Sequence, residues 1–479
     1  MSLEDRLYPL LKHYVQAPQW VKTSAGYAYS LIPKPLRYGK AYRHFYSDIQ
    51  CPSADIPALT DRRLDETLQW AIRTVPAYRE YQSLLTADLS PKEVLSQLPL
   101  VSKETFKTQP ADYLSQQQPA RTRMEMFTGG STAQPMKFFL ERNVTRMKEH
   151  AFVDEVFARL GTDPKDVTLV LRGRTVPTAS EPGGRLWMYD PIKRQLILSC
   201  DHLEPQYMPG YIQTLLEWHP RFIHAFPSAL TPLARWLSQH PQPDLTTQIA
   251  GILLTSENVY GHQMALLRSV FSCPIITHYG HSERVLMATS LPDDPRYFFW
   301  PQYGCFELID AHGKNITEPG VAGEIVGTSY DNHVMPFVRY RTGDFAVLSD
   351  TSHPNYPHYP VCERIEGRLQ EFAVCTNSRL VSITTLGAAH FDLLADAKEI
   401  QYEQMQPGCI ILKVVSPCVL SSQVQDKLRQ AVRNKTQGGC EVIIQQVSHI
   451  PRTERGKHRM MIQHLDIRRY LAAATMDAA

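Results

Sequence analysis

The chain has 479 residues, of which 43% are hydrophobic and 20% charged. This length favours more than one domain, and the composition excludes extensive disorder. The 50 basic and 48 acidic side chains leave a formal net charge of +2, which excludes a protein that binds mainly to nucleic acid phosphates.

The sequence predicts a cytoplasmic protein. No apolar run is long enough to span a bilayer, and the first residues lack a basic-then-apolar leader. The chain has nine cysteines and no C-x-x-C pair, which argues against a disulfide framework or a zinc knuckle and favours reduced thiols.

The first hundred residues predict mainly helices. Residues 64–75 carry apolar side chains at helical spacing and stop before Pro76. Residues 143–160 form a second amphipathic pattern, for which Asn143 is the expected N-cap and Gly161 the expected end.

After residue 166 the pattern changes to short apolar runs that alternate with helical segments. The runs cover 167–171, 221–226, 248–255 and 273–279, and the clearest helix between them covers 228–240. Such alternation predicts parallel strands with crossover helices, hence an α/β fold. More closely spaced runs at 305–310, 323–329, 337–342 and 345–350 predict four strands of an antiparallel, β-rich subdomain.

A separate αβ pattern begins after Gly367. It predicts a small α+β domain over 367–479, following a large N-terminal domain over 1–366.

The segment MFTGGSTAQPMKFF (126–139) is the strongest local signal for ligand binding. Its glycines allow a tight turn with outward-facing amides, its hydroxyl residues add donors, and Lys137 follows, so it can hold phosphates. The spacing excludes a P-loop. For this peptide alone, a plain turn between two strands is the more common structure.

The segment THYGHSERVLMA (277–288) allows two mechanisms. Ser282 resembles the nucleophile of a hydrolase elbow, but Arg284 occupies the position that needs a small residue. In the alternative, which we prefer, Tyr279 is a flat surface for a purine, Ser282 a hydroxyl donor and Glu283 an oxygen ligand for Mg²⁺.

Three later segments carry charged residues next to glycine. In VRYRTGDF, Asp344 can accept both hydroxyls of a ribose, or it is a simple turn aspartate. In IEGRLQEF, Gly367 and Arg368 suit a hinge, or an ordinary linker. In PRTERGKHRMM, Lys457 can neutralise charge that develops on a phosphate, or it lies in a solvated basic loop.

Together and in this order, the five segments resemble the motifs of the adenylate-forming ligases. The branch that holds phenylacetate–CoA ligases and CapK-type proteins is the most similar, because of further segments at 68–81, 98–106, 226–230 and 365–386. The resemblance runs from about residue 65 to about residue 463, and the first 60 residues match nothing.

The resemblance implies a role for each motif residue. The N-terminal domain would be the adenylation domain and the C-terminal domain a mobile lid. The implied phosphate loop is Thr128, Gly129, Gly130, Ser131 and Thr132. Ser256, Glu257 and Tyr279 would lie at adenine, and Gly280 would bind the nucleotide as well. Ser282 and Glu283 would serve phosphate and Mg²⁺, Asp344 would hold the ribose, and Arg368 would contact the nucleotide near the hinge. Lys457 would be the adenylation lysine. Phe226, Pro227, Ser228 and Trp187 could line the acid pocket, although aromatic residues after strands more often belong to the core.

Three positions depart from the pattern of this superfamily. Gly129 replaces a hydroxyl residue, Ala133 replaces a glycine, and Gln370 stands where relatives have a charged hinge residue.

The resemblance implies an ATP- and Mg²⁺-dependent ligase. It would form an acyl-adenylate from a carboxylic acid, release pyrophosphate and pass the acyl group to coenzyme A or to an amine or hydroxyl acceptor. Nucleic acid is not an expected partner, and a homodimer is compatible. Two other functions stay open: a serine hydrolase that uses Ser282, and a nucleotide-binding protein that has lost its chemistry.

Overall fold

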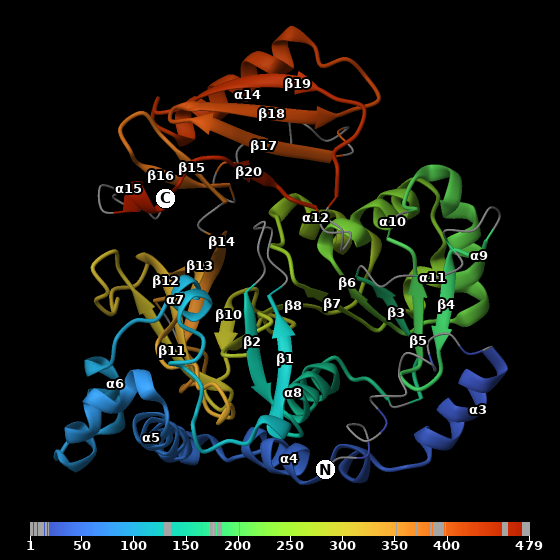
Figure 1. Cartoon of the computed structure of the whole chain (residues 1–479). Coiled ribbons are helices and arrows are strands. Elements are labelled where there is room, and N and C mark those ends of the chain that lie inside the picture. The colour runs from blue at the N-terminus through green and yellow to red at the C-terminus, as the bar shows by residue number, and fades with distance from the viewer. Residues whose placement is uncertain are drawn as a thin grey trace.

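The computed structural model describes residues 3, 7, 14, 17, 19–128, 136–163, 165–172, 176, 179, 184–200, 202–350, 352–368, 371–383, 386, 397, 399–452 and 458–471. A large N-terminal domain carries a small C-terminal domain on one side, and the N-terminal helices form the opposite side (Figure 1).

The N-terminal hundred residues are helical, as predicted. The helices are α3 (Gln19–Ser30), α4 (Lys34–Ile49), α5 (Ile56–Thr74), α6 (Pro91–Gln97) and α7 (Lys103–Thr108), with short 3-10 helices η2 (Ser53–Asp55), η3 (Pro76–Thr86) and η4 (Ala120–Thr122). Helix α5 buries Leu64, Leu68, Ala71 and Ile72 and ends before Pro76, although it begins eight residues earlier than the pattern indicates.

The second predicted helix is α8 (Thr145–Arg159). Asn143 is not its N-cap, so that prediction was wrong: Asn143 has a left-handed backbone with φ of 65°, whereas an N-cap residue is normally extended. Val144 precedes the helix and makes no capping hydrogen bond through its side chain. Gly161 has φ of +76° and follows the helix, as predicted.

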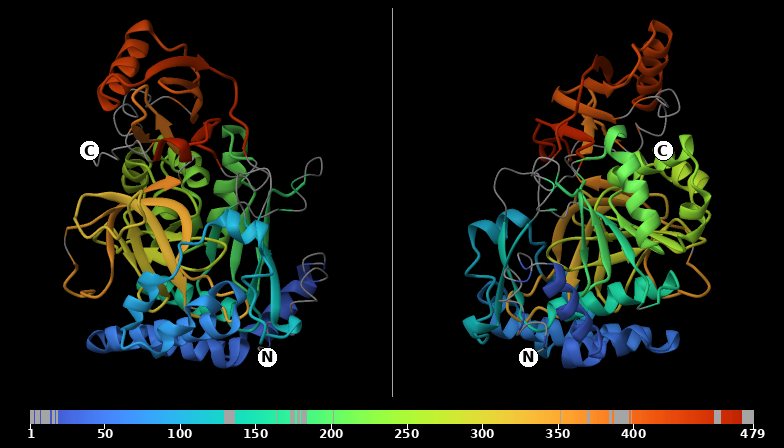
Figure 2. Two further views of the ribbon diagram at one scale, coloured as in Figure 1. Left: turned by 60° about the vertical axis from the view of Figure 1, so that its left-hand side comes forward. Right: turned by 90° about the vertical axis from the view of Figure 1, so that its right-hand side faces the viewer.

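One sheet of twelve strands forms the frame of the large domain (Figure 2). In spatial order its strands are β11 (Gly304–Ile309), β12 (Ala322–Ser329), β13 (Tyr340–Leu348), β14 (Val361–Arg368), β10 (Tyr297–Phe299), β9 (Met287–Thr289), β8 (Ile275–Gly280), β7 (Gly251–Thr255), β6 (Phe222–Ala225), β3 (Thr168–Leu171), β5 (Gln195–Leu198) and β4 (Trp187–Asp190). Strands β5, β3, β6, β7 and β8 are parallel, which confirms the α/β prediction.

The strands between 303 and 350 are antiparallel, as predicted, but they continue the same sheet. The runs on the two sides of Gly343, expected as two strands, form the single strand β13. This strand continues without a break through Gly343, whose φ is +75°. Glycine adopts this conformation without strain, so the chain keeps its direction there.

Helices cover both faces of the sheet. Helices α9 (Met208–Trp218), α10 (Pro227–Gln239), α11 (Pro243–Gln248) and α12 (Gly261–Val270) pack on one face of the parallel strands, with η6 (Pro205–Tyr207) before them. Helices α4 and α8 pack on the other face. The hairpin of β1 (Arg123–Phe127) and β2 (Lys137–Glu141) forms a separate two-stranded sheet.

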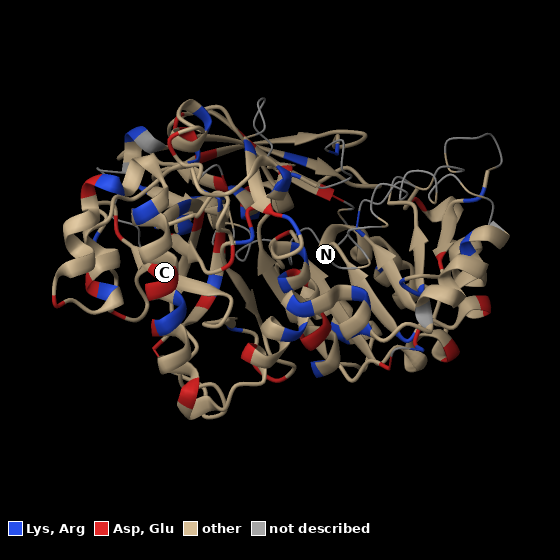
Figure 3. Cartoon of the chain, turned by 60° about the horizontal axis from the view of Figure 1, so that its bottom comes forward, with Lys and Arg blue, Asp and Glu red and all other residues tan. Residues whose placement is uncertain are grey.

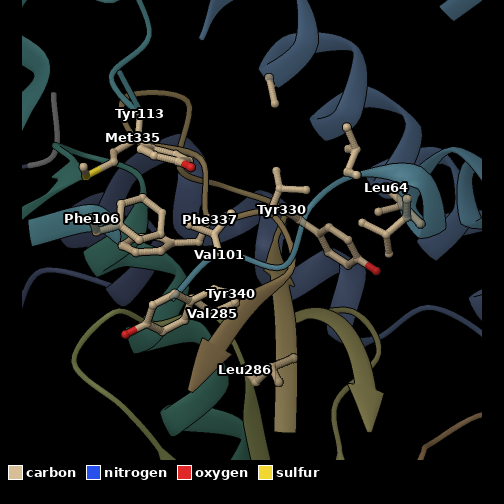
Figure 4. Close-up of a cluster of buried hydrophobic side chains, with 14 of the residues drawn as sticks. Leu64, Val101, Phe106, Tyr113, Val285, Leu286, Tyr330, Met335, Phe337 and Tyr340 are labelled. Atoms are coloured by element: carbon tan, nitrogen blue, oxygen red, sulfur yellow. The ribbon is translucent and has the colours of Figure 1, made fainter. Parts of the chain in front are cut away.

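A buried cluster joins the N-terminal helices to the antiparallel strands. Phe106 from α7 packs against Phe337 and Tyr340 at the start of β13 (Figure 4). Val101 lies in the same cluster, and its backbone bridges Tyr340. This packing fixes where the first residues of β13 lie.

The C-terminal domain has the predicted α+β pattern. A hairpin of β15 (Phe372–Val374) and β16 (Leu380–Ser382) precedes a four-stranded sheet. In spatial order its strands are β19 (Glu441–Gln446), β18 (Cys409–Val415), β17 (Glu399–Gln406) and β20 (Met461–Gln463), with α14 (Ser422–Lys435) and α15 (Arg468–Leu471). The predicted boundary at 366/367 falls inside β14. None of the described helices is long and apolar enough to cross a membrane.

Candidate functional site

The sequence motifs converge where three strands of the large sheet meet the C-terminal domain. Strand β8 ends in Tyr279 and Gly280, and a turn carries His281, Ser282 and Glu283. Strand β13 supplies Asp344, which lies opposite Arg368 in the β13–β14 ladder. The side chains of Tyr279 and Arg368 both contact Asp344, although the two residues are 89 positions apart in the sequence.

Asp344 connects the candidate adenine and hinge residues. Its Oδ2 accepts a hydrogen bond of 2.9 Å from the Tyr279 hydroxyl, and its Oδ1 lies 3.4 Å from Nε of Arg368. The Asp344 carboxylate raises the pKa of Arg368, while burial raises the pKa of Tyr279 well above its usual value. The group therefore presents a carboxylate, a guanidinium and an aromatic ring in one place.

Glu283 is held by a residue that the motifs did not single out. Its Oε1 accepts a hydrogen bond of 2.7 Å from the hydroxyl of Tyr340, and Glu283 is buried. Burial raises the pKa of Tyr340 well above its usual value, so the phenol stays a donor. Tyr340 thus fixes the carboxylate that the sequence predicts as a metal ligand.

Lys103 and His281 complete the surroundings of Glu283. Burial lowers the pKa of Lys103, and the nearby charge of Glu283 opposes this effect. Burial also lowers the pKa of His281, whose Nε2 accepts a hydrogen bond of 3.3 Å from the amide of Val285. The sequence contained a signal for Lys103, since it lies in the branch segment 98–106, but no chemical role followed from that segment.

The phosphate-loop prediction falls largely outside the described residues. Gly129, Gly130, Ser131, Thr132 and Ala133 belong to the undescribed stretch 129–135.

The described residues on both sides of that stretch form the end of the β1–β2 hairpin. Thr128 accepts a hydrogen bond of 2.9 Å from the amide of Met136 through its hydroxyl oxygen, and its own amide donates to the Met136 carbonyl at 3.0 Å. Thr128 is buried there. Lys137 pairs with Glu125 at 2.5 Å across the hairpin.

Ser228 and Glu257 meet at the start of α10 and contact the C-terminal domain. The Glu257 carboxylate accepts two hydrogen bonds of 3.0 Å, from the amide and the hydroxyl of Ser228. Nη1 of Arg452 lies 3.4 Å from the same hydroxyl oxygen, while its Nη2 pairs with Glu399 at 2.8 Å. Arg452 therefore ties the two domains together. Ser256, next to Glu257, has a left-handed backbone with φ of 67°.

Lys457 and its neighbours 453–456 are outside the described residues, but both ends of this segment are described. Arg452 before it contacts Ser228. His458 after it hydrogen bonds the Ile400 carbonyl at 2.8 Å and experiences the charge of Glu257. The segment that carries Lys457 therefore follows a residue that contacts the large domain.

The residues expected to line an acid pocket lie in different surroundings. Phe226 and Pro227 are buried, and Phe226 packs in the apolar cluster beneath α9 and α10. Trp187 packs against Trp218 on the edge strand β4, with four strands between it and β8. Only Ser228 of this group contacts the C-terminal domain through a described hydrogen bond.

The hinge holds a carboxylate that the motifs did not identify. Oε2 of Glu371 accepts hydrogen bonds of 3.3 Å from Nδ2 of Asn258 and from the amide of Arg368. Burial raises the pKa of Glu371 to about 7. Gly367 has φ of +99°, and a β-carbon there would collide with Glu371 and Asn258, so the hinge requires glycine. Gln370, the predicted departure, is outside the described residues.

The structure gives no support to the hydrolase alternative. A nucleophile elbow places strain at the nucleophile, but here the positive φ, 55°, belongs to Arg284. Within the part of the chain that is described, no histidine hydrogen bonds the hydroxyl of Ser282, which a serine nucleophile needs as its base.

The residues present suit Mg²⁺ better than a metal held by protein alone. Among the described residues, no three His, Cys, Asp or Glu side chains gather around a common point. Mg²⁺ usually takes one or two carboxylates and completes its shell with water and substrate phosphates, so a single Glu283 is compatible with it.

Comparisons with known proteins show which proteins this chain is similar to. No protein-family model matches the chain. Protein CapK of Staphylococcus aureus is 22% identical over 433 residues, which cover 88% of this chain and 93% of CapK. A 2-hydroxyisobutyryl-CoA ligase in its postadenylation state, bound to R3-HIB-AMP, has a TM-score of 0.63 at 16% identity, over 86% of this chain and 90% of the ligase.

The chain has the fold of the adenylate-forming ligases. A GH3.15 acyl acid amido synthetase has a TM-score of 0.58 at 13% identity, over 88% of this chain and 93% of that chain. The predicted resemblance to the adenylate-forming ligases, including the CapK-type branch, is therefore confirmed. Other states of the 2-hydroxyisobutyryl-CoA ligase are less similar, with TM-scores of 0.54 for an open conformation and 0.50 for the thioesterification state.

Proposed function

We propose that this adenylate-forming ligase homologue activates a carboxylic acid with ATP and transfers the resulting acyl group. In the first step the carboxylate attacks the α-phosphate, forming an acyl-adenylate and releasing pyrophosphate. In the second step a thiol, amine or hydroxyl attacks the mixed anhydride and releases AMP. The observation that carries the proposal is the contact of Tyr279, Asp344 and Arg368 next to Glu283.

Each residue of this group suits one part of ATP. The Asp344 carboxylate can accept two hydrogen bonds from the ribose hydroxyls, and charged acceptors make the strongest hydrogen bonds of this kind. Arg368, half exposed beside it, can reach the sugar or a phosphate. The Tyr279 ring offers a flat surface for adenine. Ser256 and Gly280, at the ends of β7 and β8, are the proposed residues beside the base.

Glu283 would hold the Mg²⁺ of the nucleotide, together with phosphate oxygens. The metal would supply charge neutralisation at the phosphates. Tyr340 orients the carboxylate, and Lys103 places a second cation near it. The described hairpin ends at Thr128 and Met136 would carry the phosphate loop 129–132, with Ser282 as a further hydroxyl donor.

Lys457 is the proposed source of positive charge at the transition state. An ammonium group over the α-phosphate stabilises charge that develops as the carboxylate attacks. The proposal is supported by the contact of Arg452, five residues before Lys457, with Ser228 of the large domain. We propose residues 367–479 as a domain that rotates about Gly367 between the two steps, which requires the contact of Arg452 with Ser228 to break.

The acceptor is coenzyme A or an amine or hydroxyl. Proteins of similar structure include both a CoA ligase and an acyl acid amido synthetase, so both chemistries occur on this fold. Phe226, Pro227 and Ser228 are the proposed wall of the acid pocket. We propose a cytoplasmic location, because none of the nine cysteines, all of which lie in the described ranges, forms a disulfide.

The decisive experiment is ATP–pyrophosphate exchange over a panel of carboxylic acids. We expect exchange with at least one acid, and loss of exchange in Lys457→Ala with ATP binding retained in calorimetry. Lys435→Ala, in exposed α14, is the control and should behave as the wild type. Full exchange in Lys457→Ala would refute the role of that lysine.

The same panel separates the alternatives. ATP binding without exchange for any acid would indicate a nucleotide-binding protein without ligase activity. Labelling of Ser282 by a fluorophosphonate probe, unaffected by ATP, would instead indicate a hydrolase. Mass spectrometry of products with and without coenzyme A would identify the acceptor class.

A further inference from the structure

The N-terminal helices expose an unusual number of large apolar side chains. Six of the ten exposed large hydrophobic residues in the described part of the chain lie between positions 7 and 46. The most exposed are Trp20 at 73%, Tyr27 at 69%, Leu31 at 67% and Leu36 at 65%. Contact between so many large apolar side chains and water is unfavourable, and elsewhere the fold buries side chains of the same kind.

These side chains form a stripe that points away from the protein. Trp20, Tyr27 and Leu31 are separated by seven and four residues, so they share one face of α3 and of the turn that follows it. On another face of α3, Gly26 packs so tightly on Pro191 that a β-carbon would collide with it. Helix α3 therefore rests on the β4–β5 turn through Gly26 and turns its aromatic stripe outward.

The same helices are basic, and Asp48 near the end of α4 is their one acidic residue. Residues 19–47 contain Lys22, Lys34, Arg37, Lys40 and Arg43 and neither Asp nor Glu. In α4, Lys40 and Arg43 lie opposite the buried face formed by Tyr42, Phe45 and Ile49. No acidic residue in the described ranges lies within ion-pair distance of Lys22, Lys40 or Arg43.

The carboxylates that border this region are already engaged within the fold: Asp48 with Arg63, Asp154 with Lys34 and Tyr42, and Glu155 with Arg159 and Gln50. They therefore do little to cancel the outward positive charge.

We call the outward side of α3 and α4 the basal face. Figure 3 turns this side of the molecule toward the viewer.

The basal face lies away from the candidate site. In Figures 1 and 2 the N-terminal helices form the end of the molecule opposite the C-terminal domain. A flat partner could cover α3 and α4 without touching the hinge at Gly367 or the contact between Arg452 and Ser228.

We propose that the basal face docks the protein on a membrane surface rich in anionic lipids. Trp and Tyr prefer the headgroup region, where the ring meets the acyl chains and the polar edge stays hydrated. Neighbouring Lys and Arg side chains bind anionic headgroups. A helix with an apolar, aromatic stripe beside basic residues lies in the interface rather than spanning the bilayer.

A second copy of this chain is a less suitable occupant. A two-fold dimer would place the basal face against itself and bring the cations Lys22, Lys40 and Arg43 of the two copies together. Like charges in contact are unfavourable, and anionic lipid removes this cost.

The test is co-sedimentation of the full chain with phosphatidylcholine vesicles, with and without phosphatidylglycerol. We expect binding only to the anionic vesicles and a loss of binding at high salt, because screening weakens the charge contribution. K40E/R43E should lower the partition coefficient at least about tenfold, since each basic residue contributes several-fold. The W20S/L31S substitutions alone should also lower the partition coefficient, and they should do so at low salt as well.

The control variants carry substitutions of the same kind in the C-terminal domain, at the opposite end of the molecule. R433E/K435E reverses two exposed charges of α14 and changes the net charge by the same amount. V419S/M405S removes two exposed apolar side chains of the C-terminal domain. Both should bind vesicles like the wild type, and circular dichroism with thermal melting should show that all four variants fold.

Three results would overturn the proposal. The first is a wild-type protein that stays in the supernatant with anionic vesicles, and the second is an equal loss of binding in the α14 control. The third is a wild-type protein that does not bind vesicles but forms a dimer, which the W20S/L31S substitutions dissociate. Because none of these readouts involves ATP, they are independent of the proposed ligase activity.

Discussion

The hydroxyl of Tyr340 donates a 2.7 Å hydrogen bond to Oε1 of Glu283, and the two residues lie 57 positions apart. Packing of Phe106 and Phe337 against the Tyr340 ring fixes that hydroxyl at the first residue of β13. The orientation of the candidate metal ligand therefore depends on the buried core below it.

Tyr340→Phe is expected to lower the rate of ATP–pyrophosphate exchange about tenfold or more, because a hydrogen bond to a charged group contributes about 1.5–3 kcal/mol. The Mg²⁺ concentration for half-maximal exchange should rise as well. Tyr211→Phe is the control, since it removes a comparably buried hydroxyl bond to the Ser199 carbonyl, far from the site. Equal loss in both variants would mean that Tyr340 acts only through stability.

Asp344→Asn is expected to weaken nucleotide binding more than it slows the chemical step. The substitution keeps the shape but removes the charge that pairs with Arg368 and that would accept the ribose hydroxyls. Calorimetry should give a Kd for ATP at least about tenfold higher. Asp310→Asn, in the turn after β11, should leave the Kd unchanged; an unaltered Kd in Asp344→Asn would remove Asp344 from the ribose site.

Glu371 predicts a pH dependence of the hinge. Its pKa is raised from 4.5 to about 7 by burial, so the folded arrangement binds a proton more tightly than the solvated carboxyl does. The contribution of this protonated carboxyl group to the free energy of unfolding is fully present below pH 4.5 and is lost as the pH rises through about 7.

Glu371→Gln mimics the protonated form and should remove this dependence. Thermal melting from pH 5 to 8 should show that the Tm of the variant increases relative to the Tm of the wild type as the pH rises. The difference in Tm should be largest near pH 8. Glu441→Gln, on exposed β19, is the control. A constant difference between Glu371→Gln and the wild type across this range would show that Glu371 does not titrate there.

The buried pair of Lys148 and Asp331 predicts a strong effect on stability. Nζ of Lys148 lies 2.6 Å from Oδ1 of Asp331 and 3.7 Å from the centre of the Tyr303 ring, and both charged side chains are fully buried. Lys148→Met leaves Asp331 without its cation, so urea denaturation should show a loss of about 3–5 kcal/mol. K148M/D331L should recover part of that loss, and a double variant as unstable as Lys148→Met would contradict this explanation.

The sequence predicts the residues that recur in short motifs and misses those that reach the site through packing. Tyr279, Asp344 and Arg368 belong to recognisable segments, and the structure brings them into contact. Tyr340 lies only four residues before Asp344, yet nothing in VRYRTGDF indicates that its hydroxyl meets Glu283. That contact depends on the tertiary packing of α7 against β13.

Local backbone conformation limited the prediction of element boundaries. The pattern around Asn143 fits an N-cap by residue type, but residue type does not reveal a left-handed φ. Two short runs on either side of Gly343 read as two strands, because their pattern does not show whether a glycine turns the chain or lets it continue. The parallel strands were predictable because each is a short apolar run with a helix behind it.

The unbroken ladder from β11 to β4 has a mechanical consequence for the whole large domain. Each strand shares backbone hydrogen bonds with its neighbours, so no seam divides the parallel half from the antiparallel half. The large domain is therefore expected to melt as one cooperative unit, while the C-terminal domain, whose four strands form a sheet of their own, is free to lose its order at a different temperature.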